Sequence, residues 1–171
     1  NIAVERERLT EVRNRATHII DTTDMPTAEL KEKIWKLYSG NGGVERMIVL
    51  VQSFGFKHGL PLDSDMVLDV RFLPNPFYEE DLKRLTGNDQ PVADFICRFP
   101  QTFQFLKKEE EMLEFLLPQY ISEGKSQLVI SVGCTGGQHR SVFIANRLYE
   151  FLRTQGYAVQ LTHRDLQRKN K

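Results

Sequence analysis

The chain has little cysteine, no excess charge of either sign and no long hydrophobic run. Its two cysteines among 171 residues, Cys97 and Cys134, have a spacing that favours free thiols over a disulfide or a zinc site. Lysine plus arginine equals aspartate plus glutamate at 23 each, which argues against a strongly basic nucleic-acid binder and leaves only local patches. No apolar stretch approaches membrane-spanning length. We therefore expect a cytoplasmic protein with no metal and no membrane partner.

What the chain does contain is an alternation of helical and strand patterns. Helical spacing is found at 4–16, after Pro26, and at 79–85, 91–98, 102–122 (with a disturbance expected at Pro118) and 141–152. Strand patterns cover 17–21, 46–51, 66–72, 128–132 and 158–162. This alternation predicts an α/β fold, a layered domain with a mostly parallel sheet flanked by helices.

A glycine-rich segment divides the chain. Residues 39–43 read Ser-Gly-Asn-Gly-Gly, the composition of a linker. The chain also opens at Asn1 inside a helical pattern, so we expect a piece of a longer protein. These features predict a short N-terminal part at 1–43 and a domain at 44–171.

The strand pattern at 128–132 runs into a glycine-rich loop and then directly into a helix. Glycines let a backbone approach a ligand closely, and a helix N-terminus offers unpaired N–H groups to an anion. Two cationic side chains at the helix start can add charged hydrogen bonds. The segment therefore predicts a phosphate site formed by Cys134, Thr135, Gly136, Gly137, His139, Arg140 and Ser141.

Two other interpretations of this segment remain open: a purely structural turn, and the nucleophile loop of a cysteine-dependent phosphatase. Cys134, Arg140 and Ser141 fit the pattern C-x5-R-[ST], in which a thiolate attacks a phosphate held by the arginine. Against the phosphatase, Gly133 stands where such enzymes usually have histidine, and no acidic loop is evident. The sequence Gly124-Lys125-Ser126 is not a Walker loop, because the required first glycine is absent.

Outside this segment, several polar residues are further candidates. Asp69 and Arg71 share one strand face and form either an ion pair or, with Asn75, the polar floor of a ligand site. Lys57, in a glycine-flanked loop, either reaches an anion or is solvated. The C-terminal end is a solvated tail or an RNA contact, and its basic residues are Arg164, Arg168, Lys169 and Lys171.

Taken together, three motifs resemble the C-terminal domain of the RapZ family, also called YvcJ-like nucleotide-binding proteins. The motifs are Ser53-Phe54-Gly55-Phe56-Lys57, Asp69-Val70-Arg71-Phe72-Leu73-Pro74-Asn75-Pro76 and Gly133-Cys134-Thr135-Gly136-Gly137 with His139-Arg140-Ser141. The resemblance implies a fold similar to a subdomain of 6-phosphofructokinase. It also implies that residues 1–43 are the remnant of an N-terminal P-loop domain that binds and hydrolyses ATP and GTP. The chain itself would then need no cofactor.

The resemblance further implies a non-catalytic sensing or adaptor domain in a bacterial, cytoplasmic, dimeric or tetrameric protein. Its expected ligand is glucosamine-6-phosphate, and its expected partners are a small RNA and an endoribonuclease. By position, the sugar-phosphate contacts fall on the loop residues named above and on Arg98. The chain departs from RNA-adaptor members at three positions, Phe77, Gln138 and Tyr157, where those members have a histidine and two lysines. We therefore expect the phosphate site to be kept and leave the sugar and the RNA open.

Overall fold

The computed structural model describes residues 2–38 and 47–167, so the linker predicted at 39–43 lies outside the described residues. The chain divides into two compact units, Asn1–Val44 and Glu45–Lys171. Within the described part of the chain, no helix combines the length and the apolar character needed to cross a membrane.

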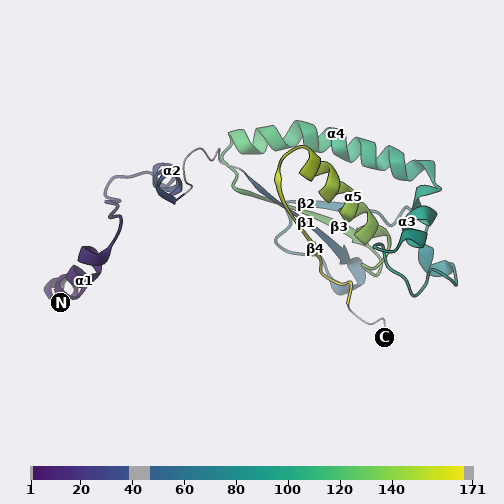
Figure 1. Cartoon of the computed structure of the whole chain (residues 1–171), viewed down its shortest axis with the longest axis horizontal. Helices are drawn as coiled ribbons and strands as arrows, with labels where there is room; N and C mark the ends of the chain where they lie inside the picture. The colour runs from purple at the N-terminus through teal and green to yellow at the C-terminus, as the bar shows by residue number, and fades with distance from the viewer. Residues whose placement is uncertain (1, 39–46, 168–171) are drawn as a thin grey trace. The chain divides into compact units, whose positions relative to one another are not determined.

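The first unit contains two helices, α1 (Ile2–Arg15) and α2 (Thr27–Tyr38) (Figure 1). Both were predicted from the spacing of apolar residues. The strand predicted at 17–21 is wrong, since these residues form an irregular connection between the helices. An extended segment needs a neighbouring strand for its backbone hydrogen bonds, and the described residues of this unit offer none.

The second unit is built on a four-stranded sheet of β1 (Ile48–Gly55), β2 (Met66–Asp69), β3 (Gln127–Cys134) and β4 (Ala158–His163). The strand order is β2-β3-β1-β4 and every pair is parallel. The predicted α/β fold with a mostly parallel sheet is therefore confirmed. Gly55 lies opposite Cys134 in the register of β1 and β3, so the loops after both strands meet at one edge of the sheet.

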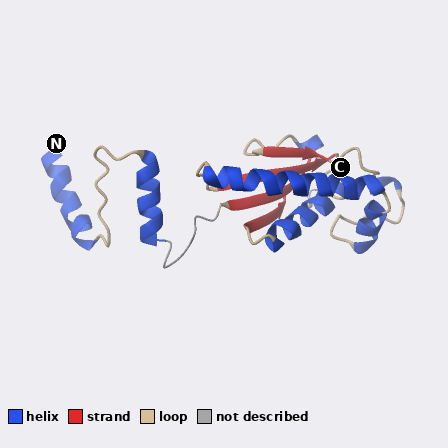
Figure 2. Ribbon diagram, turned by 90° about the horizontal axis from the view of Figure 1, so that it is seen from above, coloured by secondary structure: helices blue, strands red, loops and turns tan. Residues whose placement is uncertain are grey.

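The helices of this unit are α3 (Gln90–Cys97), α4 (Pro100–Ser122) and α5 (Arg140–Thr154). α4 is continuous through Pro118, so no break occurs there. Figures 1 and 2 show α4 and α5 over the same face of the sheet. The apolar core lies between these two helices and the sheet. It includes Val49, Val51, Leu113, Leu117, Leu128, Ile130, Val132, Leu148 and Leu152.

Two predicted strand ends are corrected by the structure. The strand predicted to end at residue 51 continues to Gly55, because β1 pairs with β3 along its whole length. The loop that contains Lys57 begins only after it, with the 3₁₀ helix η1 (Phe56–His58). β2 ends at Asp69, whose carboxylate accepts the backbone N–H of Arg71 and starts a turn.

The helix predicted at 79–85 is wrong. A 3₁₀ helix, η2 (Pro76–Tyr78), is followed by separate turns. The Leu82 N–H donates to Glu79 and the Leu85 N–H donates to Leu82, both over three residues. The backbone carbonyls of Leu82 and Leu85 accept hydrogen bonds from the His139 ring, and the segment does not continue as an α-helix.

Candidate functional site

The loop between β3 and α5 is fixed by a close backbone contact with the end of β1. Gly137 has φ +76°, and a Cβ added to it would lie 2.6 Å from the backbone nitrogen of Gly55. Only glycine combines that dihedral angle with that approach. The sequence therefore folds residues 135–139 tightly against Gly55, with α5 beginning at Arg140.

Cys134 and Ser141 form the inner support of this loop. The Cys134 sulfur accepts the Gly137 N–H at 3.2 Å and lies 3.2 Å from the Ser141 hydroxyl oxygen. Both side chains are buried. These contacts join the last residue of β3 to the first turn of α5 and set the curvature of the loop.

Arg140 is a buried cation at the start of α5, with 4% of the residue exposed. Its Nη1 donates to the backbone oxygens of Arg71 at 2.9 Å and Leu73 at 2.8 Å, and its Nη2 donates to the Thr135 hydroxyl at 3.4 Å. Its Nε is buried and makes no hydrogen bond within the described residues. Burial lowers the pKa of Arg140, yet a guanidinium keeps its charge at neutral pH.

His139 lies beside it and is also buried, with 6% exposed. The backbone oxygens of Leu82 and Leu85 accept hydrogen bonds from the ring, while Nε2 makes none within the described residues. Nδ1 is therefore the donor. Burial lowers the pKa of His139, so the ring is neutral at pH 7.

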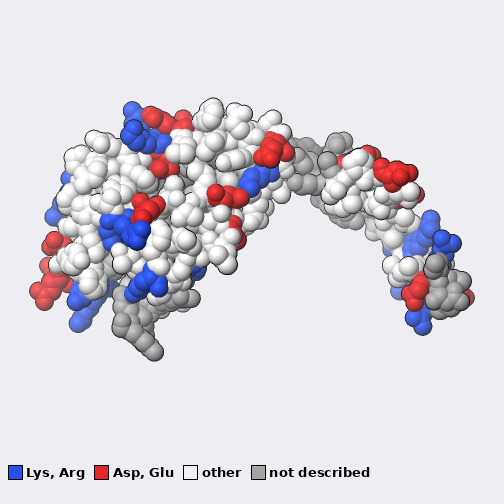
Figure 3. Space-filling view, turned by 180° about the vertical axis from the view of Figure 1, so that it is seen from behind, with Lys and Arg blue, Asp and Glu red and all other residues white. Residues whose placement is uncertain are grey.

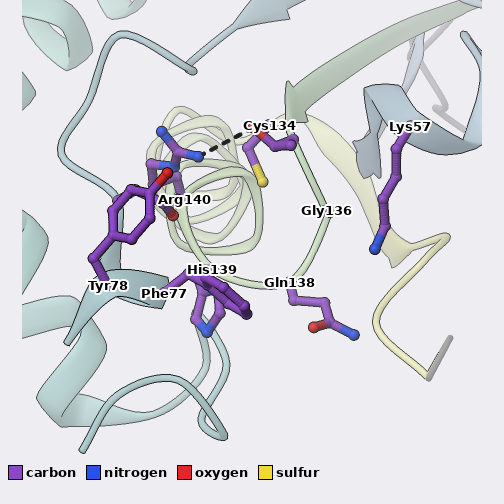
Figure 4. A pocket seen from close by; sticks show the side chains of 10 residues that line it. Lys57, Phe77, Tyr78, Cys134, Gly136, Gln138, His139 and Arg140 are labelled. Atoms are coloured by element: carbon purple, nitrogen blue, oxygen red, sulfur yellow. Dashed lines mark hydrogen bonds between the residues drawn. The ribbon is translucent and has the colours of Figure 1, made fainter. Parts of the chain in front are cut away.

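These groups open onto a pocket of about 360 Å³ (Figure 4). Figure 4 shows Lys57 on the side of the loop opposite Arg140, and the Tyr78 hydroxyl near the guanidinium. The Lys57 Nζ lies 3.9 Å from where a Cβ of Gly136 would stand, so the ammonium is close to the loop backbone. The lining residues are Lys57, Asn75, Phe77, Tyr78, Cys134, Thr135, Gly136, Gln138, His139 and Arg140.

Seven of the predicted ligand residues thus line one pocket, and two more, Gly137 and Ser141, lie directly behind it. Arg98 does not line it. This side chain is exposed and borders a separate cavity of about 390 Å³ among the acidic residues Glu79, Glu80, Asp81 and Asp94.

Asp69 and Arg71 form an ion pair at the end of β2, with 2.6 Å between Oδ2 and Nη2. The Arg71 guanidinium also stacks over the Phe56 ring at 4.1 Å. Neither side chain lines the pocket, and Arg71 contributes to it only through the carbonyl that Arg140 binds. The ion-pair interpretation of these two residues fits this arrangement better than a ligand floor.

The model of the RapZ C-terminal domain family matches residues 47–167. The chain belongs to this family. The chain is similar to nucleotide-binding proteins of Alkaliphilus oremlandii (55% identical, covering 96% of this chain) and of Clostridium kluyveri and Clostridium acetobutylicum (53% and 52% identical, each covering 97%). It spans about 57% of the length of these curated relatives.

In this RapZ-family domain, the basic residues predicted to contact RNA are only partly described. Arg164 donates to the Gly59 backbone oxygen at 2.7 Å and pairs with buried Asp165 at 2.8 Å, so it fastens the end of β4 to the loop after β1. Arg168, Lys169 and Lys171 lie outside the described residues. Figure 3 shows basic and acidic side chains intermixed on the face in view, without a single basic surface.

Three pocket residues, Phe77, Tyr78 and Gln138, were not among the predicted ligand residues, and of these Tyr78 was not singled out in the sequence at all. It follows Asn75-Pro76, and proline is common in the first turn of a short helix, so the motif indicated a turn after β2. No sequence pattern indicated that this turn would face the loop after β3. Across residues 2–38 and 47–167, His, Cys, Asp and Glu side chains form no group of three that could hold a metal ion.

Proposed function

We propose that this domain binds a phosphorylated small molecule in the pocket between Lys57 and Arg140 and acts as a sensor rather than a catalyst. One observation carries the proposal: a buried guanidinium lines an open pocket, and its Nε makes no hydrogen bond within the described residues. A buried charge with an unused donor is costly unless something pairs with it. An anionic ligand in the pocket that Arg140 lines would balance the buried charge.

The surroundings suit a phosphate. The first N–H groups of the 15-residue helix α5 point toward its N-terminal end, where the helix dipole also favours an anion. Lys57 adds a second cation near the backbone of Gly136. His139, which is buried beside Arg140, lines the same pocket.

Calorimetric titration with inorganic phosphate and with glucosamine-6-phosphate tests this assignment. We expect Lys57→Met and Arg140→Met each to weaken binding about tenfold or more, because each removes a charged hydrogen bond. Arg71→Met is the matched control, since its charged group does not line the pocket. Circular dichroism would confirm that each variant folds, and unchanged affinity in folded Lys57→Met and Arg140→Met would contradict the proposal.

For the whole protein, we propose a cytoplasmic regulator with a P-loop domain that hydrolyses ATP or GTP. The relatives are named nucleotide-binding proteins and are longer than this chain, which supports the proposal. We further propose that ligand binding modulates contact with a small RNA and an endoribonuclease in a dimer or higher oligomer. RNA affinity should then fall steeply with salt and drop when Arg168 and Lys169 are neutralised, and light scattering would give the oligomeric state.

A cysteine-dependent phosphatase is the second candidate. It is favoured by the Cys134 sulfur, which accepts the Gly137 N–H and contacts the Ser141 hydroxyl behind the pocket. It is disfavoured by Arg140, because two backbone carbonyls already occupy Nη1 and leave fewer donors for a phosphate on the sulfur. Cys134→Ser separates the two: it abolishes turnover of p-nitrophenyl phosphate in a phosphatase and leaves ligand binding largely intact in a sensor.

A further inference from the structure

One carboxylate outside the pocket, that of Asp165, lies behind both halves of the candidate site. Asp165 follows β4 and has no exposed surface. Its Oδ2 accepts the backbone N–H of Gly55 at 2.8 Å, and its Cβ lies 3.0 Å from where a Cβ of Gly137 would stand. In Figure 4 the chain after β4, in pale yellow, passes on the Lys57 side of the loop. Asp165 therefore holds the end of β1 and packs against the loop after β3, without lining the pocket.

Gly55 is the residue at which these two halves meet. It ends β1, and the next element, η1, carries Lys57. Gly137 packs on Gly55 from the loop after β3, and the Lys57 N–H donates to the Thr135 backbone oxygen at 3.3 Å. A shift of the Gly55 backbone would therefore move the ammonium of Lys57 relative to the N–H groups of the loop.

Arg164 keeps the Asp165 carboxylate in this position. The Arg164 Nε and Nη2 donate to Oδ2 of Asp165 at 3.1 Å and 2.8 Å, and Nη2 also donates to the Gly59 backbone oxygen at 2.7 Å. Burial acts to raise the pKa of Asp165, but the hydrogen bonds from Arg164 and Gly55 outweigh burial, so the pKa lies below its usual value. The carboxylate is therefore ionised at neutral pH, and an ionised acceptor makes a strong hydrogen bond with a backbone N–H.

We propose that Asp165 is a positioning residue for the candidate phosphate site, and that it couples phosphate binding to the local stability of residues 163–167. This inference rests on the proposed phosphate site and names how its occupancy reaches the segment after β4. A ligand that holds the loop against Gly55 stabilises the contact with Asp165. Loss of that contact loosens the loop, because coupling between two sites acts equally in both directions. Arg168 and Lys169 follow this segment in the sequence, so a partner bound there would respond to occupancy of the pocket.

Calorimetric titration of the chain with inorganic phosphate compares Asp165→Ala with Asp165→Asn. The asparagine oxygen can replace Oδ2 as the acceptor for Gly55, whereas alanine leaves a buried N–H without its acceptor. We expect Asp165→Ala to weaken phosphate binding about tenfold, and Asp165→Asn to bind at least as tightly as the wild-type chain. Charge alone predicts a different result, because both substitutions remove a negative charge behind the loop and both would strengthen anion binding. Equal affinities in the two folded variants overturn the inference.

Asp65→Ala is the matched control. The Asp65 carboxylate also accepts a strand N–H, that of Val129 at 2.8 Å, and pairs with a cation, Lys125, at 2.7 Å. Val129 lies inside β3 and Asp65 does not line the pocket, so phosphate affinity should stay unchanged in this variant. A tenfold loss in Asp65→Ala would overturn the inference, because the effect of Asp165→Ala would then not depend on Gly55. Circular dichroism checks the folding of every variant.

Hydrogen exchange of the wild-type chain tests the coupling without any substitution. Saturating inorganic phosphate should slow amide exchange in residues 163–167 at least about threefold and leave exchange at the end of α4, in residues 118–122, unchanged. An equal change in both segments, or no change in either, overturns the inference even if Asp165→Ala fails to fold. Failure of the proposed function is distinguishable, since the wild-type chain would then show no heat of phosphate binding in the calorimeter.

Discussion

The segment from β3 to α5 and the N-terminal unit of two helices differ sharply in burial. Leu128 and Ile130 on β3 and Leu148 on α5 have no exposed surface. By contrast, Leu9 and Val12 on α1 are 59% and 64% exposed, and no side chain that the structure describes between residues 5 and 37 is buried. Helices were predicted in both regions, yet only one region buries apolar side chains among the described residues.

This difference shows what holds the candidate site in place. α1 carries ion pairs such as Glu11–Arg15 at 2.8 Å, but exposed pairs of this kind contribute only about 0.3–0.5 kcal/mol. The loop after β3 is instead joined to a core strand and a core helix, and its backbone packs on Gly55. The backbone of the site is therefore held by the core of its own unit.

The largest effect on the free energy of unfolding is expected from Gly137→Ala, which disrupts the close contact between the loop after β3 and the end of β1. A Cβ there would meet both an unfavourable φ of +76° and the Gly55 nitrogen at 2.6 Å. We expect a loss of about 4 kcal/mol in the free energy of unfolding, combining left-handed strain with overpacking. Urea denaturation followed by circular dichroism measures it.

Gly156→Ala provides the control for that prediction. Gly156 has φ +85°, but nothing lies within 4 Å of an added Cβ, so only backbone strain applies. Its cost should be about 1–2 kcal/mol. Equal losses in the two variants would show that the packing against Gly55 contributes nothing.

A somewhat smaller loss in the free energy of unfolding is expected from Leu148→Ala on α5. Its comparison with Leu9→Ala on α1 tests the difference in burial between the two regions. Leu148 is fully buried, so its truncation should cost about 3 kcal/mol. Leu9→Ala on α1 should change the free energy of unfolding by less than about 0.5 kcal/mol. Thermal or urea unfolding of both variants tests the contrast, and a comparable loss in Leu9→Ala would mean that α1 is covered in solution.

The same contrast explains how much of the fold could be predicted from the sequence. Strand β3 was predicted because its apolar run has the character of a buried parallel strand. The segments at 17–21 and 79–85 were misassigned because their local patterns do not reveal missing partners. The first has no partner strand among the residues that the structure describes, and two carbonyls of the second accept hydrogen bonds from His139, more than fifty residues away in the chain.

The site divides in the same way. Cys134 to Arg140 could be proposed together because strand, loop and helix start are consecutive in the sequence. Tyr78 and the two carbonyls that bind Arg140 could not, since they come from the turn after β2 and reach the loop only through the order of the sheet. Arg98 was carried over by family position, and the structure places it outside the pocket. Ligand binding by all of these residues stays a prediction.

The smallest effect is expected at Glu109, where α4 places a carboxyl group between core leucines. Glu109 is 7% exposed and its Oε2 makes no hydrogen bond within the described residues. Burial raises its pKa, so the unfolded chain ionises at a lower pH than the folded one. The free energy of unfolding should therefore fall as pH rises from the usual glutamate range through the raised pKa.

Glu109→Met removes that loss while filling the same space between Leu106 and Leu113. We expect a gain of about 1 kcal/mol at pH 7 that disappears below about pH 4, where the wild-type carboxyl is neutral in both states. Glu114→Met, at an exposed position of α4, should give no pH-dependent gain. Urea denaturation at several pH values checks both, and a gain that grew on acidification would refute the argument. Such a gain would mean that the core of this domain accepts the ionised Glu109 without cost. The first unit has no buried side chain among those described, so it offers no comparable position.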